Sequence, residues 1–227
     1  LAAEMVIKSV EGYQRFCSNF LATSRQGFDR DILFTNEEAI EWVNTSGRSW
    51  PSAQGALGGR QAGVVVAYDP KTGKRAPIWG MGRHNHQNNV ALPGFKDLVM
   101  LSGDDTFLTN PAQSQVYSYI ARNTRDIWAD KGDLWAFVSD TPGFDDYYDF
   151  VPGSTETVSG HFVKVPKDIA TGRLNGTGRD LMAADKGYPA PIVGDFATDA
   201  AGLPTDGPQY VLEKWSDENA VFQFVRI

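Results

Sequence analysis

The chain contains one cysteine, Cys17, among its 227 residues. A single cysteine excludes an intrachain disulfide and also excludes a thiolate cluster of the kind that holds structural zinc. Because Cys17 lies beside the aromatic residues Phe16 and Phe20, it is predicted to be a small buried core residue rather than a nucleophile.

Long apolar runs and an excess of basic residues are also missing. No stretch approaches the roughly 18 consecutive apolar residues that a transmembrane segment needs. Acidic residues outnumber basic ones by 28 to 21, which gives a formal net charge of -7, so no nucleic-acid partner is expected. No glycine-rich phosphate loop precedes a helix, and no spacing supports a Ser-His-Asp triad. An acidic chain of this kind is compatible with a hard cation such as calcium.

Short strands separated by turns make up most of the sequence, and 41% hydrophobic residues suffice for a packed core. The residues 4–22 are the best candidate for a helix, and residues 50–63 are predicted to form a loop. Between two strands, the segment DPKTGK at residues 69–74 predicts a hairpin turn. Strands are predicted at residues 31–35, 63–68, 75–79, 98–101, 114–120, 132–138, 155–165, 210–215 and 220–227.

Repeated hairpins with aromatic residues predict an all-β fold, either a sandwich or a β-propeller. The phrases VVVAYDPKTGK and GDLWAFVSD favour the propeller. Residues 1–227 are expected to form a single propeller-like domain, with a loop-rich insertion at residues 166–208 that holds at most short helices. Because the sequence begins at Leu1 and stops just after an apolar run, we expect it to be part of a longer chain.

The segment at residues 83–105, RHNHQNNVALPGFKDLVMLSGDD, concentrates polar side chains around a short apolar strand. The Arg83 guanidinium could bind phosphate or carboxylate through two parallel hydrogen bonds. The imidazoles of His84 and His86 could serve as neutral ligands or as acids. Alternation along a strand would place the two histidines on one face. The alternative is that they are ordinary loop histidines beside a solvated turn.

Two pairs of adjacent carboxylates follow predicted strands, Glu37 and Glu38 in TNEE and Asp104 and Asp105 in GDDT. Carboxylates gathered at strand ends repel one another unless a cation neutralises them. A bound metal ion is the simplest explanation for carboxylates placed in this way. The alternative is that each pair lies in a solvated turn.

A third acidic group, Asp145, Asp146 and Asp149, stands among aromatic residues. Its spacing matches no recognisable set of metal ligands, so it is predicted to lie on an exposed loop with the aromatic rings packed beneath it.

The succession ILFTNEE, GRHNHQNNVALPGFKDLVMLSGDDT, SQVYSYIA and GDLWAFV, over about residues 34–138, resembles the PhoX-type alkaline phosphatases. In that family the corresponding motifs read T-C-E-E, G-R-x-x-H-E and G-D-D, followed by a Y-x-Y/F strand. The resemblance implies a six-bladed propeller, calcium and iron in a central site, a periplasmic or extracellular location, and hydrolysis of phosphate esters.

By the same resemblance, Glu37 and Glu38 would be metal ligands, and Asp104 and Asp105 would line the same site. His86 would match the histidine of the H-E pair.

Two positions depart from the family pattern. Asn36 stands where the phosphatases have an iron-binding cysteine, and Gln87 stands where they have a glutamate. An amide oxygen can bind calcium but is a poor ligand for ferric iron, so calcium is the expected cofactor and iron is doubtful.

Two functions remain open. In the first, a calcium-dependent phosphoesterase acts on a phosphorylated small molecule, with Arg83 or His86 neutralising developing charge while a metal-bound water attacks. In the second, the propeller has lost iron and is an extracellular binding or structural module that calcium stabilises. The replacements at Asn36 and Gln87 favour the second function, and the retained carboxylates are compatible with both.

Overall fold

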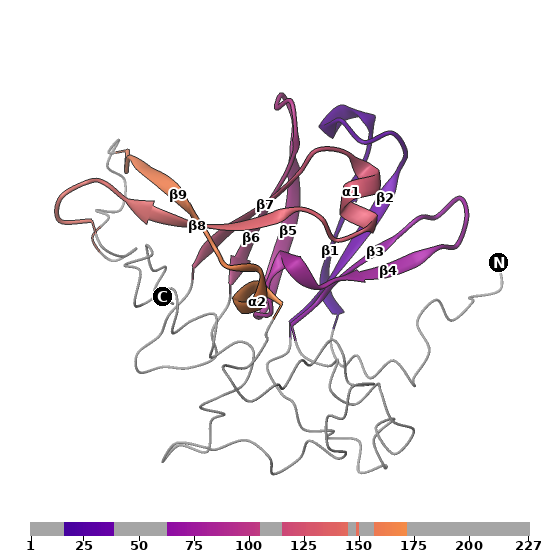
Figure 1. Cartoon of the computed structure of the whole chain (residues 1–227), viewed down its shortest axis with the longest axis horizontal. Coiled ribbons are helices and arrows are strands. Elements are labelled where there is room, and N and C mark those ends of the chain that lie inside the picture. The colour runs from indigo at the N-terminus through magenta and orange to yellow at the C-terminus, as the bar shows by residue number, and fades with distance from the viewer. Residues whose placement is uncertain (1–15, 39–62, 105–114, 145–148, 150–156, 172–227) are drawn as a thin grey trace, which may run out of the picture.

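The computed structural model describes residues 16–38, 63–104, 115–144, 149 and 157–171. These residues form two antiparallel sheets, in which each strand pairs with the next one in sequence (Figure 1). The first sheet contains β1 (Phe16–Ala22), β2 (Ile32–Glu37), β3 (Val65–Tyr68) and β4 (Arg75–Ile78). The second contains β5 (His86–Leu92), β6 (Leu98–Asp104), β7 (Val116–Ala121), β8 (Asp133–Ser139) and β9 (Gly160–Lys164).

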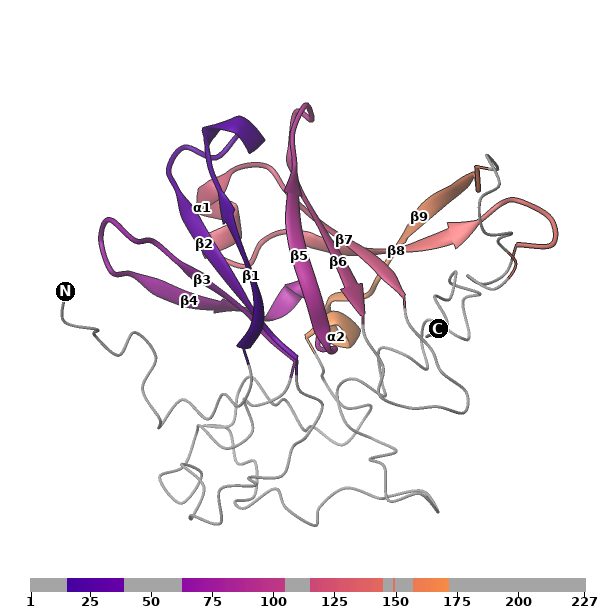
Figure 2. The same cartoon turned by 180° about the vertical axis from the view of Figure 1, so that it is seen from behind.

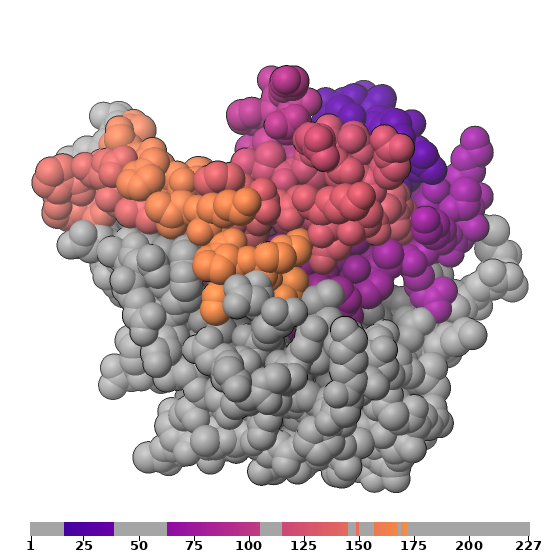
Figure 3. All heavy atoms as spheres, viewed as in Figure 1, coloured from indigo at the N-terminus to yellow at the C-terminus, as the bar shows by residue number. Residues whose placement is uncertain are grey.

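Short helical segments connect or flank the strands. The 3-10 helices are η2 (Ser24–Gln26) and η5 (Trp79–Met81), and the α-helices are α1 (Thr124–Trp128) and α2 (Lys167–Ala170). Figure 3 shows the segment around α1 lying over the front of the sheets, where α1 contacts β4 and β7. None of the helices described has the length and apolar character needed to cross a membrane.

One hydrophobic core joins the two sheets. β1 and β5 contact each other and lie side by side in both cartoon views, and the sheets spread from there in opposite directions (Figures 1 and 2). Side chains of both sheets meet in this core, including Phe34, Met100 and Leu134, which are at most 1% exposed. The fold thus confirms the all-β expectation, but the residues described do not form a closed propeller.

The hairpin turn predicted between β3 and β4 is confirmed. One oxygen of Asp69 accepts hydrogen bonds from the backbone N–H groups of Lys71 and Thr72, at 2.9 and 3.1 Å. Gly73 has φ 71°, which only glycine adopts without a steric penalty. The turn residues therefore supply both the side-chain acceptor and the left-handed conformation that the chain reversal requires.

The helix predicted for residues 4–22 is wrong where the structure describes it, because residues 16–22 form β1. Phe16, Phe20 and Ala22 point inward while Cys17 and Leu21 are exposed, which is the period-two pattern of a strand. The prediction that Cys17 is a buried core residue is also wrong, since its position in that alternation faces solvent.

Most other strand predictions are confirmed, since each predicted range up to residue 165 overlaps one of the observed strands, although β2, β6, β7 and β8 run further than predicted. The strand β5 is an element that the sequence did not predict separately. The ranges 210–215 and 220–227, almost all of the loop 50–63, and the insertion beyond residue 171 lie outside the described residues.

Candidate functional site

A group of buried polar side chains lies where β2 ends, β5 begins and β6 ends, and we refer to it as the polar cluster. Register places His86, the first residue of β5, opposite Asp104, the last residue of β6. All members are at most 5% exposed, although several are charged or amide side chains. They are Asn36, Glu37, Arg83, His84, Asn85, His86, Asn89, Ser102, Asp104 and Gln115.

The segment Gly63–Val64 connects the end of β2 to the histidines. The Glu37 N–H donates to the Val64 carbonyl at 3.0 Å, and the Val64 N–H donates to Glu37 Oε2 at 3.3 Å. On the other side, Gly63 lies so close to the His84 backbone that a Cβ at residue 63 would overlap it. The contacts of Gly63 and Val64, just before β3, therefore place the sequence-predicted residue Glu37 near the histidine segment that includes His86.

The hydrogen bonds of His86 with Gly82 and Ser102 indicate which ring nitrogen carries the proton. Its Nε2 lies 3.1 Å from the Gly82 carbonyl oxygen, which can only accept, so Nε2 carries a proton. The pKa of His86 is lowered to about 4, chiefly by burial, and the nearby Arg83 charge contributes to this lowering. At neutral pH the ring is uncharged, and Nδ1 accepts the hydroxyl proton of Ser102 at 2.8 Å.

The same argument fixes the tautomer of His84. Because Ser102 donates its proton to His86, its oxygen accepts from His84 Nε2–H at 3.1 Å. Burial, and then the neighbouring His86, keep the pKa of His84 well below its usual value. His84 Nδ1 is therefore an unprotonated nitrogen, and it meets no hydrogen-bond partner among the residues described.

Arg83 places a buried positive charge beside these neutral rings. The centre of its guanidinium lies 4.6 Å from the centroid of the Trp79 ring, a cation–π arrangement. The side chain is 0% exposed. A buried guanidinium is a strong donor for an anionic oxygen, because the low local dielectric strengthens the interaction.

Several amides of the cluster keep polar atoms with no hydrogen-bond partner in the described part of the chain. They include both polar atoms of Asn85, Oδ1 of Asn36, Oδ1 of Asn89 and Nε2 of Gln115. By contrast, Asn36 Nδ2 donates to the Ser18 hydroxyl at 2.9 Å. Buried polar atoms of this kind normally meet ordered water, an ion or a ligand.

Not every predicted site residue joins the cluster. A shift in register between His86 and Asn88 accompanies the exposed position of Gln87, so Gln87 does not share the buried environment of His86. Glu38 is half-buried just after β2, and Asp105 lies outside the described residues. Within the described ranges, no three or more His, Cys, Asp and Glu side chains are placed to hold a metal together.

The third acidic group is described only in part. Asp149 is exposed, as predicted, and Asp145 and Asp146 lie outside the described residues.

Sequence reasoning gave no role to Ser102 or Asn85, and it assigned a catalytic role to His86 but none to His84. The available signal was strand pairing: Ser102 precedes Asp104 by two residues on β6 and therefore shares its side of the sheet. The contact of the Ser102 hydroxyl with both histidines could therefore be predicted only from the pairing of β5 with β6.

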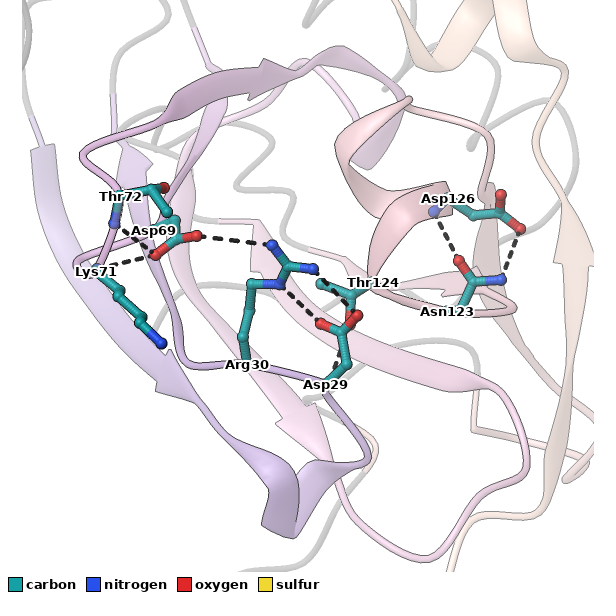
Figure 4. A network of polar contacts seen from close by, with 8 residues as sticks. All are labelled: Asp29, Arg30, Asp69, Lys71, Thr72, Asn123, Thr124 and Asp126. Carbon is teal, nitrogen blue, oxygen red and sulfur yellow. Dashed lines mark hydrogen bonds and ion pairs between the residues drawn. The ribbon is translucent and has the colours of Figure 1, made fainter.

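A second polar group, at the opposite ends of the strands, is internally paired (Figure 4). Arg30 Nε donates to Asp29 at 3.0 Å, and Arg30 also lies 3.9 Å from Asp69. The Asp29 N–H donates to the Thr124 hydroxyl at 3.2 Å. The hydrogen bond from Arg30 lowers the pKa of the Asp29 carboxyl. These contacts join the loop before β2 to the β3–β4 turn and to α1, and they have a structural role.

No family model, no curated protein and no solved structure matches this sequence.

Proposed function

We propose that this chain belongs to a PhoX-like, calcium-binding propeller protein that hydrolyses phosphate monoesters at the polar cluster. The observation that carries the proposal is the burial of Glu37, Arg83, His86 and Asp104 near the ends of neighbouring strands, with His86 paired in register with Asp104. Carboxylates favour a cation and a guanidinium favours an anion, so the cluster offers both halves of a metal–phosphate site.

The chemistry of the donors fits calcium. Asn36 Oδ1, Glu37 and Asp104 provide buried oxygen atoms of the type that calcium prefers. Calcium takes about six to eight oxygens, so further oxygens would come from Asp105, Glu38, water or the phosphate itself. When bound, calcium would neutralise the carboxylates and polarise the phosphate group.

The donors do not fit the iron of the family. Asn36 replaces the thiolate, and Gln87 is exposed. We therefore derive no step through iron.

The residues of the chain have distinct roles in this proposal. Arg83 would bind a phosphate oxygen and neutralise charge that develops on it. His86 has both ring nitrogens engaged, so it orients the cluster and is not the proton acceptor. His84 presents an unprotonated Nδ1, the ring nitrogen that can accept a hydrogen bond from a substrate hydroxyl or water.

The alternative is a non-catalytic extracellular binding or structural module that calcium stabilises. Asn36 and Gln87 favour it, because the ligands that distinguish the enzymes are replaced, and so does the full engagement of the His86 ring. In both cases we propose a periplasmic or extracellular location. The phosphorylated small molecule is a partner in the first case only.

The deciding experiment is hydrolysis of an aryl phosphate by the full-length protein, first with calcium and then with a chelator, with bound metals quantified in the same sample. Turnover that requires calcium supports the phosphoesterase. Calcium binding without turnover supports the structural module, and the absence of calcium binding overturns both.

Two charge-neutralising variants test the assigned ligands. Glu37→Gln and Asp104→Asn are each expected to weaken calcium binding at least tenfold. Asp140→Asn is the matched control, because Asp140 is exposed and its carboxylate pairs only with His161 among the residues described. Equal calcium affinity in all three variants would remove Glu37 and Asp104 from the site.

A further inference from the structure

The short helix η5 connects the first sheet to the polar cluster and supplies two of its contacts. Trp79 underlies the Arg83 guanidinium, and the carbonyl of Gly82, just after η5, accepts from His86 at 3.1 Å. The position of η5 therefore contributes to both the place of the Arg83 charge and the tautomer of His86.

One carboxylate from a distant part of the chain holds η5. The Gly80 N–H donates to Asp130 Oδ2 at 2.8 Å. Asp130 follows α1 and has φ 49°, a left-handed conformation that is uncommon for residues other than glycine, asparagine and aspartate. This backbone conformation aims the carboxylate at a segment 50 residues away in sequence.

The other oxygen of Asp130 is also engaged. Asp130 Oδ1 accepts from the Tyr119 hydroxyl and from Lys167 Nζ, each at 3.0 Å. Lys167, from α2, also donates to the Asp130 and Gly132 carbonyls. Burial, followed by the nearby Asp130 charge, raises the pKa of Tyr119, so its hydroxyl remains a donor. The carboxylate is thus fixed from β7 and α2 while it holds η5.

We propose that Asp130 is a positioning residue for the polar cluster: through Gly80 it fixes η5, and through η5 it fixes Arg83 and the His86 ring. Asp130 touches neither residue itself and acts only through the Trp79–Met81 turn. Its importance to activity rests on the proposed function, but its effect on the His86 ring can be measured whether or not the protein is an enzyme.

The test is the tautomer of His86 in the full-length protein, read from two-bond 1H–15N spectra of the imidazole rings. The wild-type ring is expected to show the Nε2–H form alone. Asp130→Gly removes the carboxylate but accommodates the positive φ, so a purely conformational role for residue 130 would leave the spectrum unchanged. We expect instead a mixture of tautomers, since the Gly82 carbonyl is no longer held in place.

A second comparison separates this role from the loss of an ion pair. Asp130→Asn and Asp133→Asn each break an aspartate–lysine contact, but the Asp133–Lys164 pair, at 2.8 Å, joins β8 to β9 and does not hold η5. Only Asp130→Asn is expected to change the His86 signal. If the protein hydrolyses aryl phosphates, Asp130→Gly should also lower kcat by about tenfold or more, as small misplacements of catalytic groups do.

An unchanged His86 spectrum in folded Asp130→Gly overturns the proposal. If the Asp130 variants do not fold, Gly80→Ala tests the same contact by changing η5 instead of the carboxylate. The added Cβ would overlap Lys167 Nζ and Asp130 Oδ1, so the Gly80–Asp130 contact would be displaced. A wild-type His86 signal in Gly80→Ala would likewise overturn the proposal. A failed hydrolysis assay leaves this ring measurement intact, so the two proposals fail separately.

Discussion

The imidazole rings of His84 and His86 lie against each other with their centroids 3.7 Å apart. Two protonated rings at about that separation would repel by roughly 4 kcal/mol even at an effective dielectric constant of about 20. The contact therefore excludes two protonated rings, and burial, which lowers the pKa of both, keeps both neutral at neutral pH. The shared Ser102 hydroxyl gives them a directional chain of hydrogen bonds.

The first prediction concerns acid. The pKa of each histidine is lower in the folded protein than its ordinary value of 6.5, so the unfolded chain binds more protons below that pH. Stability should be fully present above about pH 6.5 and should fall toward pH 4, by about 1.4 kcal/mol per pH unit for each histidine. Urea unfolding at a series of pH values measures this slope, and His86→Gln should reduce it. Constant stability across the interval would contradict the buried neutral pair.

The second prediction concerns the shared hydroxyl. Ser102→Ala leaves His84 Nε2–H without its acceptor and His86 Nδ1 without its donor. We expect a loss of about 2–3 kcal/mol in the free energy of unfolding, since two buried groups lose their partners. Ser118→Ala is the control, because Ser118 is also buried but lies one position from Tyr117 and so faces the other side of β7. Similar losses in both variants would refute the histidine–serine chain.

The third prediction concerns the β3–β4 turn. A Cβ added at Gly73 or at Gly103 would have no atom within 4 Å, so alanine fits in both places. Of these two glycines, Gly73 has a positive φ and Gly103 does not. Gly73→Ala should therefore cost about 1 kcal/mol, whereas Gly103→Ala should be neutral or slightly stabilising. Thermal unfolding of the two variants makes the comparison, and an unaffected Gly73→Ala would show that the turn adopts another conformation.

The fourth prediction concerns Arg83 and rests on the proposed phosphoesterase activity. Arg83→Lys keeps the charge but loses the planar fork and the stacking on Trp79. We expect kcat/KM for an aryl phosphate to fall by about tenfold to a hundredfold. Arg25→Lys, on exposed η2, should behave as the wild type. Wild-type kinetics in Arg83→Lys would exclude a direct contact between Arg83 and phosphate.

The elements that the sequence predicted well are those whose signals are local. The β3–β4 hairpin combines a β-branched run with a proline- and glycine-containing turn, and both features act within a few residues. The buried β6 strand was evident from its apolar residues alone. For β1, the aromatic residues fitted a helix as well as a strand, and pairing with β2 decided the outcome.

The polar cluster was predicted in part for the same reason. Arg83, Glu37 and Asp104 stood out as charged residues near strand ends, and the structure buries all three, while their roles at a site stay a prediction. The exposure of the Gln87 side chain follows from an irregular register between β5 and β6. The role of Asp130 follows from its hydrogen bond with the Gly80 N–H, 50 residues away in sequence. Tertiary pairing determines both features, and no local sequence pattern encodes them.

The contact between β1 and β5 has a consequence for the order of folding. Residues 23–85, 63 in number, separate the two strands in the chain, whereas each sheet is built from pairs of successive strands. Hairpins form quickly, and because joining the two sheets closes a longer loop, we expect it to be the slower step. The histidines are packed between segments from both sheets and should become shielded from water only at that step. The rate at which they become protected from solvent would therefore report the rate of the last folding step.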